Sequence, residues 1–213
     1  MPVITISRQF GSGGSRVAAL VAERLHVEVV DQSLIAEVAR RAALSPEDVQ
    51  AEDERPSTLL DRLALSFSPL AVGLGVAWEP PYPDPAYDPR REVLQLTQDV
   101  VREVARSGNA VIVGRGGAFI LHDRPDLLSV FLHADPAFRR KSVMEREGID
   151  QAAADRRLRE MDSNRAAYIK QVYGHDWLDL RLYDLAIDTG RLGLETAAAV
   201  ILAAAEARGG TRP

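Results

Sequence analysis

The sequence predicts an α/β fold in which helices cover both faces of a mostly parallel five-stranded sheet, giving three layers. Short apolar, β-branched runs alternate with longer segments whose apolar residues recur at helical spacing, a pattern typical of a parallel sheet with helical crossovers. The first run enters a glycine-rich turn that continues into a helix, an arrangement that binds phosphate groups. The 213 residues are enough for one domain, 1–213, with a well-formed core.

Five strands are expected from short apolar runs bounded by polar or glycine residues. The most continuous run, Ala110 to Val113, is typical of a buried parallel strand. Polar residues follow the carboxyl ends of these runs, where sheets of this kind bind their ligands. The expected strands are 3–6, 27–30, 110–113, 127–132 and 185–188.

Helices are expected between the strands. Asp135-Pro136 is a helix start signal, and Gly174 is a stop signal for a long helix that begins at Asp150. A second start signal lies at Ser45-Pro46. Helical spacing of apolar residues is found over 17–25, 34–42, 59–65 and 93–104, and an alanine-rich helix is expected over 195–207.

Residues 66–91 have a different composition, with six prolines and the aromatic residues Trp78, Tyr82 and Tyr87 among them, but no helical or strand periodicity. A loop of this length is uncommon in a compact domain and usually has a function. Its aromatic residues argue against simple disorder. We expect this segment to form a flap over the site.

Composition excludes several classes of protein. The formal net charge is −5, so general attraction to nucleic acid or to anionic membranes is not expected. No apolar run is long enough to span a bilayer, and no signal-peptide pattern is found. The absence of cysteine excludes disulfides and thiolate chemistry. These features suit a cytoplasmic protein.

The first loop allows three interpretations. It departs from the phosphate-loop pattern G-x-x-x-x-G-K-[ST] at two positions, because Arg8 stands at the first glycine and Gly14 at the lysine. It also resembles a dinucleotide-binding fingerprint followed by an acid, Asp31, although Arg16 stands where the third glycine is needed. The third interpretation is a glycine-rich turn without a ligand.

Two further motifs carry charge. Arg115, between glycines at the end of a buried strand, is either a solvated surface charge or a ligand for an anion. Asp162 and Arg165 lie on one face of the long helix, either as a helix-stabilising ion pair or as part of a clamp on a transferred phosphoryl group. The four histidines show no metal-ligand spacing, and Trp177 is expected to be a packing anchor.

Taken together, these segments resemble the cytidylate-kinase-like family of phosphate-loop nucleoside monophosphate kinases. The resemblance covers nearly the whole chain. It rests on segments in the same order and spacing, namely Ile6 to Gly14, Val113 to Gly116, Leu132 to Pro136 followed by Arg139, Met161 to Arg165, and Tyr183 to Gly193.

The resemblance implies an ATP- and Mg²⁺-dependent kinase whose helical lid, 137–167, closes over the phosphates. Region 31–107, including the 66–91 flap, would bind the monophosphate. Asp31, Arg115 and Asp162 would contact the acceptor, and Arg139 and Arg165 the phosphoryl groups. The loop residues Gly11, Ser12, Gly13, Gly14 and Ser15 would hold the ATP phosphates, with Ser15 facing the metal.

The chain departs from ordinary cytidylate kinases at the loop lysine, at the threonine position occupied by Arg16, and at Gly116, which replaces the acid of a Gly-Arg-Asp motif. We hypothesise that Arg8 or Arg16 supplies the missing positive charge, since an arginine fork can hold two phosphate oxygens.

The sequence thus predicts phosphoryl transfer from ATP to a nucleoside monophosphate, with CMP or dCMP as the first expectation. The alternatives are a kinase for a different small acceptor and a nucleotide-binding protein that does not transfer phosphate.

Overall fold

The computed structural model describes residues 2–27, 29–31, 89–106, 108 and 110–210. The expected helices over 34–42 and 59–65 and the start signal at Ser45-Pro46 lie outside these residues. So does the 66–91 flap, except for 89–91 at the start of a helix.

The described chain forms one five-stranded parallel sheet with the strand order β2-β3-β1-β4-β5. All five expected strands are confirmed; the last has the expected bounds, and the ends of the other four are shifted by one or two residues. Their bounds are β1 Val3–Arg8, β2 Val29–Val30, β3 Val111–Val113, β4 Leu127–His133 and β5 Leu185–Asp188.

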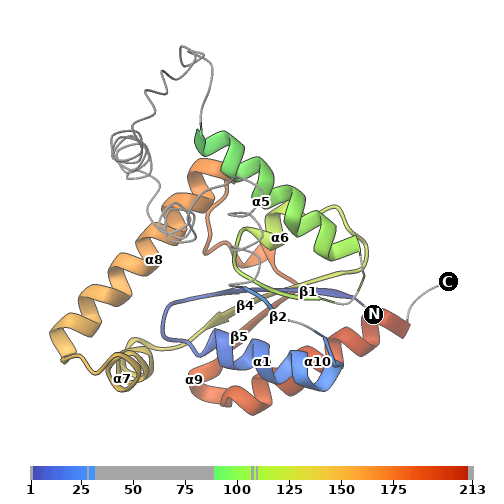
Figure 1. Ribbon diagram of the computed structural model, residues 1–213. Coiled ribbons are helices and arrows are strands. Elements are labelled where there is room, and N and C mark those ends of the chain that lie inside the picture. Colours follow the sequence, from blue (N-terminus) through green and yellow to red (C-terminus); the bar gives the residue numbers. More distant parts are fainter. Residues whose placement is uncertain (1, 28, 32–88, 107, 109, 211–213) are drawn as a thin grey trace, which may run out of the picture.

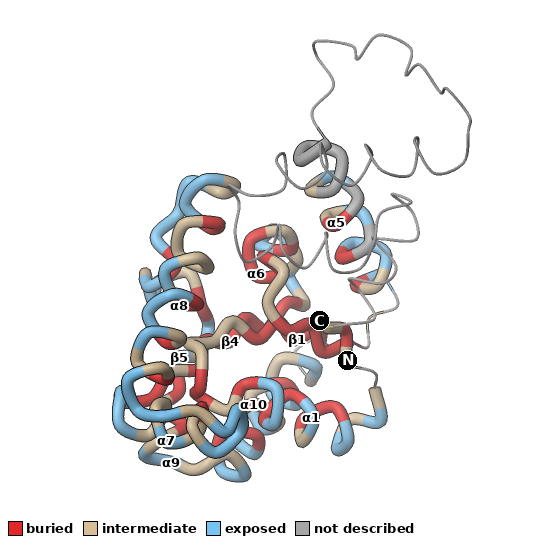
Figure 2. The backbone as a smooth tube through the Cα atoms, turned by 60° about the vertical axis from the view of Figure 1, so that its left-hand side comes forward, coloured by how far each residue is buried: buried red, intermediate tan, exposed pale blue. Residues whose placement is uncertain are grey.

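Helices cover both faces of this sheet, which confirms the three-layer prediction (Figure 1). On one face, α1 (Gly14–Leu25) packs beside α10 (Leu194–Gly210). On the other face lie α5 (Pro89–Arg106) and the short α6 (Gly117–Ile120). Figure 2 shows that burial is concentrated in the strands between these layers.

The alternation of side chains along β1 explains why both faces are covered. Ile4 and Ile6 pack with α1 and α10, whereas Val3 packs with Val101 of α5. Successive side chains of a strand point to opposite faces, so a strand that is apolar on both faces needs a helical layer on each.

A helical hairpin beside one edge of the sheet consists of α7 (Pro136–Glu147) and α8 (Gln151–Tyr173). Asp135 caps α7 by accepting hydrogen bonds from the backbone N–H groups of Ala137 at 2.8 Å and Phe138 at 3.0 Å. Gly174 ends α8 in the left-handed conformation, with a φ of 77°. The structure confirms both predicted helix boundaries. Such start and stop signals depend on residues that are close together in the sequence, so they can be predicted from it.

Two short helices and one 3₁₀ turn were not expected. They are α6, α9 (Thr189–Leu192) and η1 (Leu180–Leu182). Each has only one turn, which is too short to show helical periodicity in the sequence.

The strand order is incompatible with the dinucleotide-binding alternative. That fold places its second strand directly beside the first, in the order 3-2-1-4-5-6. Here β3 lies between β1 and β2. Arg16 also occupies the exposed side of α1, where the fingerprint needs a glycine facing the sheet.

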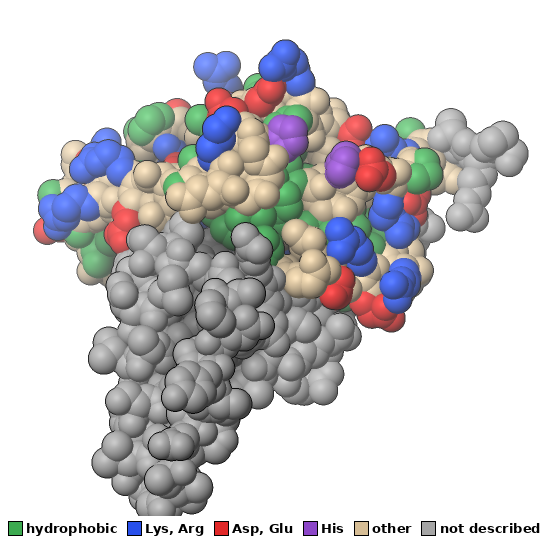
Figure 3. Space-filling view, turned by 90° about the horizontal axis from the view of Figure 1, so that it is seen from above, with side chains coloured by type: hydrophobic (Ala, Val, Ile, Leu, Met, Phe, Trp, Pro, Cys, Tyr) green, Lys and Arg blue, Asp and Glu red, His purple; other side chains and the backbone are tan. Residues whose placement is uncertain are grey.

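The face of the molecule seen in Figure 3 carries mixed charge. In Figure 3, the Lys and Arg side chains lie among Asp and Glu side chains, in keeping with the net charge of −5. Within the described ranges, no helix has a stretch long and apolar enough to cross a membrane.

Candidate functional site

The loop between β1 and α1 wraps around the first turn of α1. Gly11 and Gly13 have φ values of 80° and 79°, which an L side chain rarely adopts, and Gly13 caps the helix. A Cβ atom on Gly11 would lie 2.7 Å from the Arg139 carbonyl oxygen, so the α7 backbone approaches the loop closely. The first backbone N–H groups of α1 have no partners within the helix, and such groups bind anions.

A buried threonine, Thr189, holds the loop between β1 and α1 in place. Thr189 Oγ1 lies 2.7 Å from the Ser12 carbonyl oxygen and 3.0 Å from the His133 carbonyl oxygen. The Ser12 hydroxyl donates to the Gln9 carbonyl at 2.8 Å. Ser12 is therefore a buried part of the loop framework. Sequence reasoning did not give Thr189 this role, although its position directly after the last strand was a usable signal.

A cavity of about 430 Å³ lies in front of the loop. Its described lining includes four of the residues expected to hold ATP phosphates, namely Gly11, Gly13, Gly14 and Ser15. Asp31, Arg16 and Arg146 also line it. A space of this volume is within the range of small-ligand sites, about 300–1,000 Å³.

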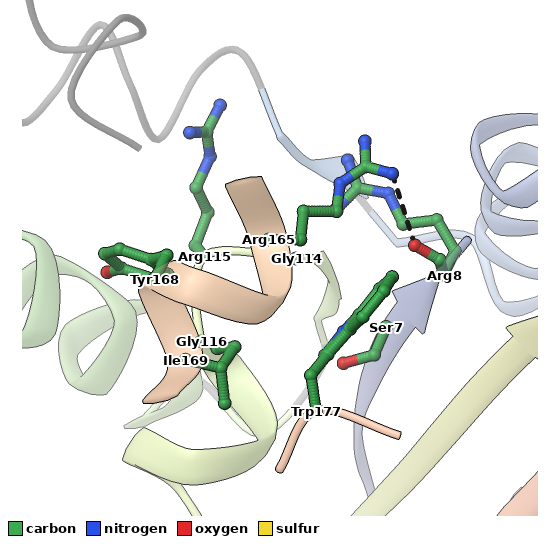
Figure 4. A pocket seen from close by; sticks show the side chains of 9 residues that line it. All are labelled: Ser7, Arg8, Gly114, Arg115, Gly116, Arg165, Tyr168, Ile169 and Trp177. Atoms are coloured by element: carbon green, nitrogen blue, oxygen red, sulfur yellow. Dashed lines mark hydrogen bonds between the residues drawn. The ribbon is translucent and has the colours of Figure 1, made fainter. Parts of the chain in front are cut away.

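A second, smaller cavity of about 60 Å³ lies beside it (Figure 4). It is bounded by Ser7 at the end of β1, Gly116 of the turn after β3, Tyr168 and Ile169 of α8, and Trp177. Its volume suits a single compact group, such as a phosphate, next to an aromatic wall.

Three arginines line both cavities: Arg8, Arg115 and Arg165. They come from the end of β1, the turn after β3 and α8. Arg165 Nη1 donates to the Arg8 carbonyl at 3.3 Å, as drawn in Figure 4. Elements far apart in the sequence thus bring three arginines to the lining that the two cavities share.

The backbone around Arg115 is unusual. Gly114, Arg115 and Gly116 have φ values of 73°, 57° and 68°, so three successive residues are left-handed. A left-handed arginine costs about 1 kcal/mol or more, and such strain is concentrated at functional sites. Arg115 Nη2 lies 3.9 Å from Asp31 Oδ1, which brings together two residues expected at the acceptor site.

Asp162 has a different environment from Arg115. Its Oδ1 accepts from the Phe10 backbone N–H at 2.8 Å, and its Oδ2 forms an ion pair with Arg139. Arg165 Nη1 lies 3.7 Å from the same carboxylate. Among the described residues, neither Asp162 nor Arg139 lines the two cavities. The structure places both between the loop and the α7–α8 hairpin.

Phe10 is the point at which the hairpin meets the loop. The guanidinium carbons of three arginines lie over its ring. Their distances from the ring centroid are 4.8 Å for Arg146, 5.7 Å for Arg157 and 5.5 Å for Arg165. Cation–π contacts of this kind contribute about 0.5–1 kcal/mol each at exposed sites. The sequence analysis did not identify Phe10 as the contact point for these arginines.

An aromatic cluster supports the smaller cavity. Trp177 is 4% exposed and packs edge-on against Phe131 at 5.4 Å, which confirms it as a packing anchor. Tyr183 donates its hydroxyl to the Trp177 carbonyl at 3.1 Å. Burial raises the pKa of Tyr183 to about 12, although a hydrogen bond with Ser7 lowers it.

Mg²⁺ fits the donor groups of the larger cavity. In phosphate-transfer sites this ion takes one or two protein oxygens together with substrate phosphates. The exposed Ser15 and the carboxylate of Asp31 line the cavity together. A cluster of three or more His, Cys, Asp or Glu residues able to hold a metal is not found in the part of the chain that the structure describes.

The sequence model of the cytidylate kinase-like family matches residues 3–191. A cytidylate kinase from Methanopyrus kandleri is 36% identical in an alignment of 111 residues that covers 48% of this chain. The chain spans 58% of the length of that relative.

Solved structures agree on the fold. An uncharacterized protein from Eubacterium ventriosum has a TM-score of 0.70 at 25% identity, over 97% of this chain and 99% of the other. Shikimate kinase from Acinetobacter baumannii has a TM-score of 0.53 at 12% identity, over 97% and 94%. The latter likeness concerns the fold alone, which is that of phosphate-loop kinases.

Proposed function

The chain belongs to the cytidylate kinase-like family, and from that premise we propose that it transfers a phosphoryl group from ATP to a nucleoside monophosphate, CMP or dCMP first. The observation that carries this proposal is the sharing of Arg8, Arg115 and Arg165 by two adjoining cavities. A phosphoryl transfer needs a donor site and an acceptor site with positive charge between them.

In this proposal the larger cavity binds the ATP phosphates and the smaller one the acceptor phosphate. The glycine loop supplies backbone N–H groups to the donor, and Ser15 is the residue that would hold Mg²⁺, which would offset phosphate charge. Arg115 orients the acceptor with the help of Asp31, which lies 3.9 Å away. Asp162 and Arg139 act through the loop, to which they are joined at Phe10.

The chemistry requires little of the protein beyond position and charge. An oxygen of the acceptor phosphate bonds to the γ-phosphorus as the bond from that phosphorus to the ADP oxygen breaks. No general base is needed, since the attacking oxygen is already ionised. The three arginines offset charge on the transferred group.

A second candidate is a protein that binds a nucleotide without transferring phosphate. The observation that favours it is the loop itself, which has Gly14 at the position where the phosphate-loop pattern has lysine.

The test is ATP consumption in Mg²⁺ with CMP, dCMP, UMP, AMP or GMP, beside a reaction without acceptor. The proposal expects one or two acceptors to raise the rate at least about tenfold over the control. Equal rates in all reactions, from a folded protein that binds ATP, would favour the binding protein or a different acceptor.

A further inference from the structure

The two departures from the phosphate-loop pattern, Arg8 and Gly14, are in contact with each other. A Cβ atom on Gly14 would lie 2.7 Å from Cγ and 2.9 Å from Cβ of Arg8. Non-bonded carbon atoms are most stable at about 3.5–4.0 Å. The arginine side chain therefore occupies the space that any side chain at residue 14 would need.

The backbone gives no other reason for a glycine at residue 14. Gly14 is the first residue of α1 and is not among the residues with positive φ. Glycine within a helix is less stable than alanine. Contact with Arg8 is thus the reason that the structure gives for Gly14.

The far end of Arg8 is also placed by a glycine. A Cβ atom on Gly114 would lie 2.0 Å from Nη1 and 3.1 Å from Cζ of Arg8. The side chain thus runs from the end of β1, across the start of α1, to the turn after β3. Its guanidinium reaches the boundary between the two cavities, since Arg8 lines both.

Arg16, the other candidate for the missing charge, is placed differently. It is exposed on α1 and, of the two cavities, lines only the larger. Arg16 is therefore not among the residues that line both cavities, as Arg8, Arg115 and Arg165 do.

We propose that Arg8 and Gly14 are an exchanged pair, in which an arginine at the first position of the loop replaces the lysine at the seventh and binds the terminal phosphates of a nucleoside triphosphate. This inference rests on the proposed function for the identity of the ligand. A guanidinium can hold two phosphate oxygens at once. The glycines at residues 14 and 114 leave room for its path.

The experiment compares ATP affinity by calorimetry in the wild type, Arg8→Gly, Gly14→Lys and the double exchange Arg8→Gly/Gly14→Lys. Arg8→Gly should weaken ATP binding by about 10- to 100-fold, as expected for a lost charged hydrogen bond. Gly14→Lys should also weaken it, because the new side chain collides with Arg8. The double exchange should bind ATP at least about tenfold more tightly than Arg8→Gly.

Two further variants serve as comparisons. Arg24→Ala removes an exposed arginine from the far end of α1 and should bind ATP as the wild type does. Arg16→Ala should weaken ATP binding less than Arg8→Gly. Circular dichroism and thermal unfolding show which variants are folded.

The outcomes separate this inference from the proposed function. The inference that Arg8 replaces the loop lysine is wrong if Arg8→Gly binds ATP as well as the wild type does. It is also wrong if Arg16→Ala weakens ATP binding more than Arg8→Gly does. In both cases the kinase proposal stands. If ATP binds through Arg8 but no acceptor is phosphorylated, the exchange stands and the kinase proposal fails. A wild type that binds no ATP contradicts both.

Discussion

At the scale of single residues, the site depends on glycines, because a side chain at these positions would take the space that Arg8 occupies. Gly114 combines a left-handed backbone with the closest approach to Arg8, and its neighbour Arg115 is left-handed as well. The turn after β3 therefore positions two arginines: Arg115, which belongs to the turn, and Arg8, whose guanidinium lies against Gly114.

Gly114→Ala should disturb Arg8 in addition to straining the backbone. Gly174→Ala is the matched control, because Gly174 has a similar φ of 77° but nothing within 4 Å of an added Cβ. Both variants should lose about 1 kcal/mol of unfolding free energy in urea, from the left-handed conformation. Only Gly114→Ala should lose ATP affinity. Equal ATP affinities in the two variants would contradict the path assigned to Arg8.

Tyr183 predicts a stability change in alkaline solution. Burial raises its pKa from 10.0 to about 12, so the folded protein holds the phenol proton where the unfolded chain has lost it. The stability that this proton contributes is fully present below pH 10 and is lost as the pH rises to about 12. Wild-type unfolding free energy should fall by about 1–3 kcal/mol more than that of Tyr183→Phe over this window. If the unfolding free energies of the two proteins fall equally over this pH range, the role assigned to Tyr183 is contradicted.

At the scale of elements, Asp162 joins the α7–α8 hairpin to the loop. It accepts the Phe10 backbone N–H and pairs with Arg139, whereas the Arg140–Asp155 ion pair joins the same two helices away from the loop. The lid role expected for 137–167 remains a proposal that this connection supports, because it lets hairpin and loop move together.

Asp162→Ala should free the Phe10 amide. We expect its hydrogen exchange to become about tenfold faster or more, as for a lost hydrogen bond to a charged group. Asp155→Ala should loosen the hairpin without changing exchange at Phe10. An unchanged rate at Phe10 in Asp162→Ala, measured by NMR, would show that the carboxylate does not hold the loop.

The sequence predicted the elements better than the contacts between them. Strands and long helices follow from local apolar patterns and from signals such as Asp135-Pro136 and Gly174. The contact between Asp162 and Phe10 joins residues 152 apart, and no local pattern encodes it. Likewise, the sequence showed that Arg8 and Gly14 depart from the phosphate-loop pattern. It could not show that they are in contact, because this depends on the path of the Arg8 side chain.

At the scale of the whole molecule, the parallel sheet makes the site. Because all five strands run in the same direction, their carboxyl ends bring Arg8, Asp31 and Arg115 to one edge. The long α8 adds Arg165 there from more than forty positions further along the chain. The fold itself was predictable from the alternation of strands and helices, while the strand order required the structure.

The most direct test of phosphoryl transfer is to identify the products by ³¹P NMR. The wild type is incubated with Mg²⁺, ATP and the acceptor that most raises ATP consumption. Our account predicts that ADP and the nucleoside diphosphate of that acceptor appear in equal amounts, with no inorganic phosphate. Inorganic phosphate and ADP alone, or unchanged ATP, would contradict transfer between the two cavities.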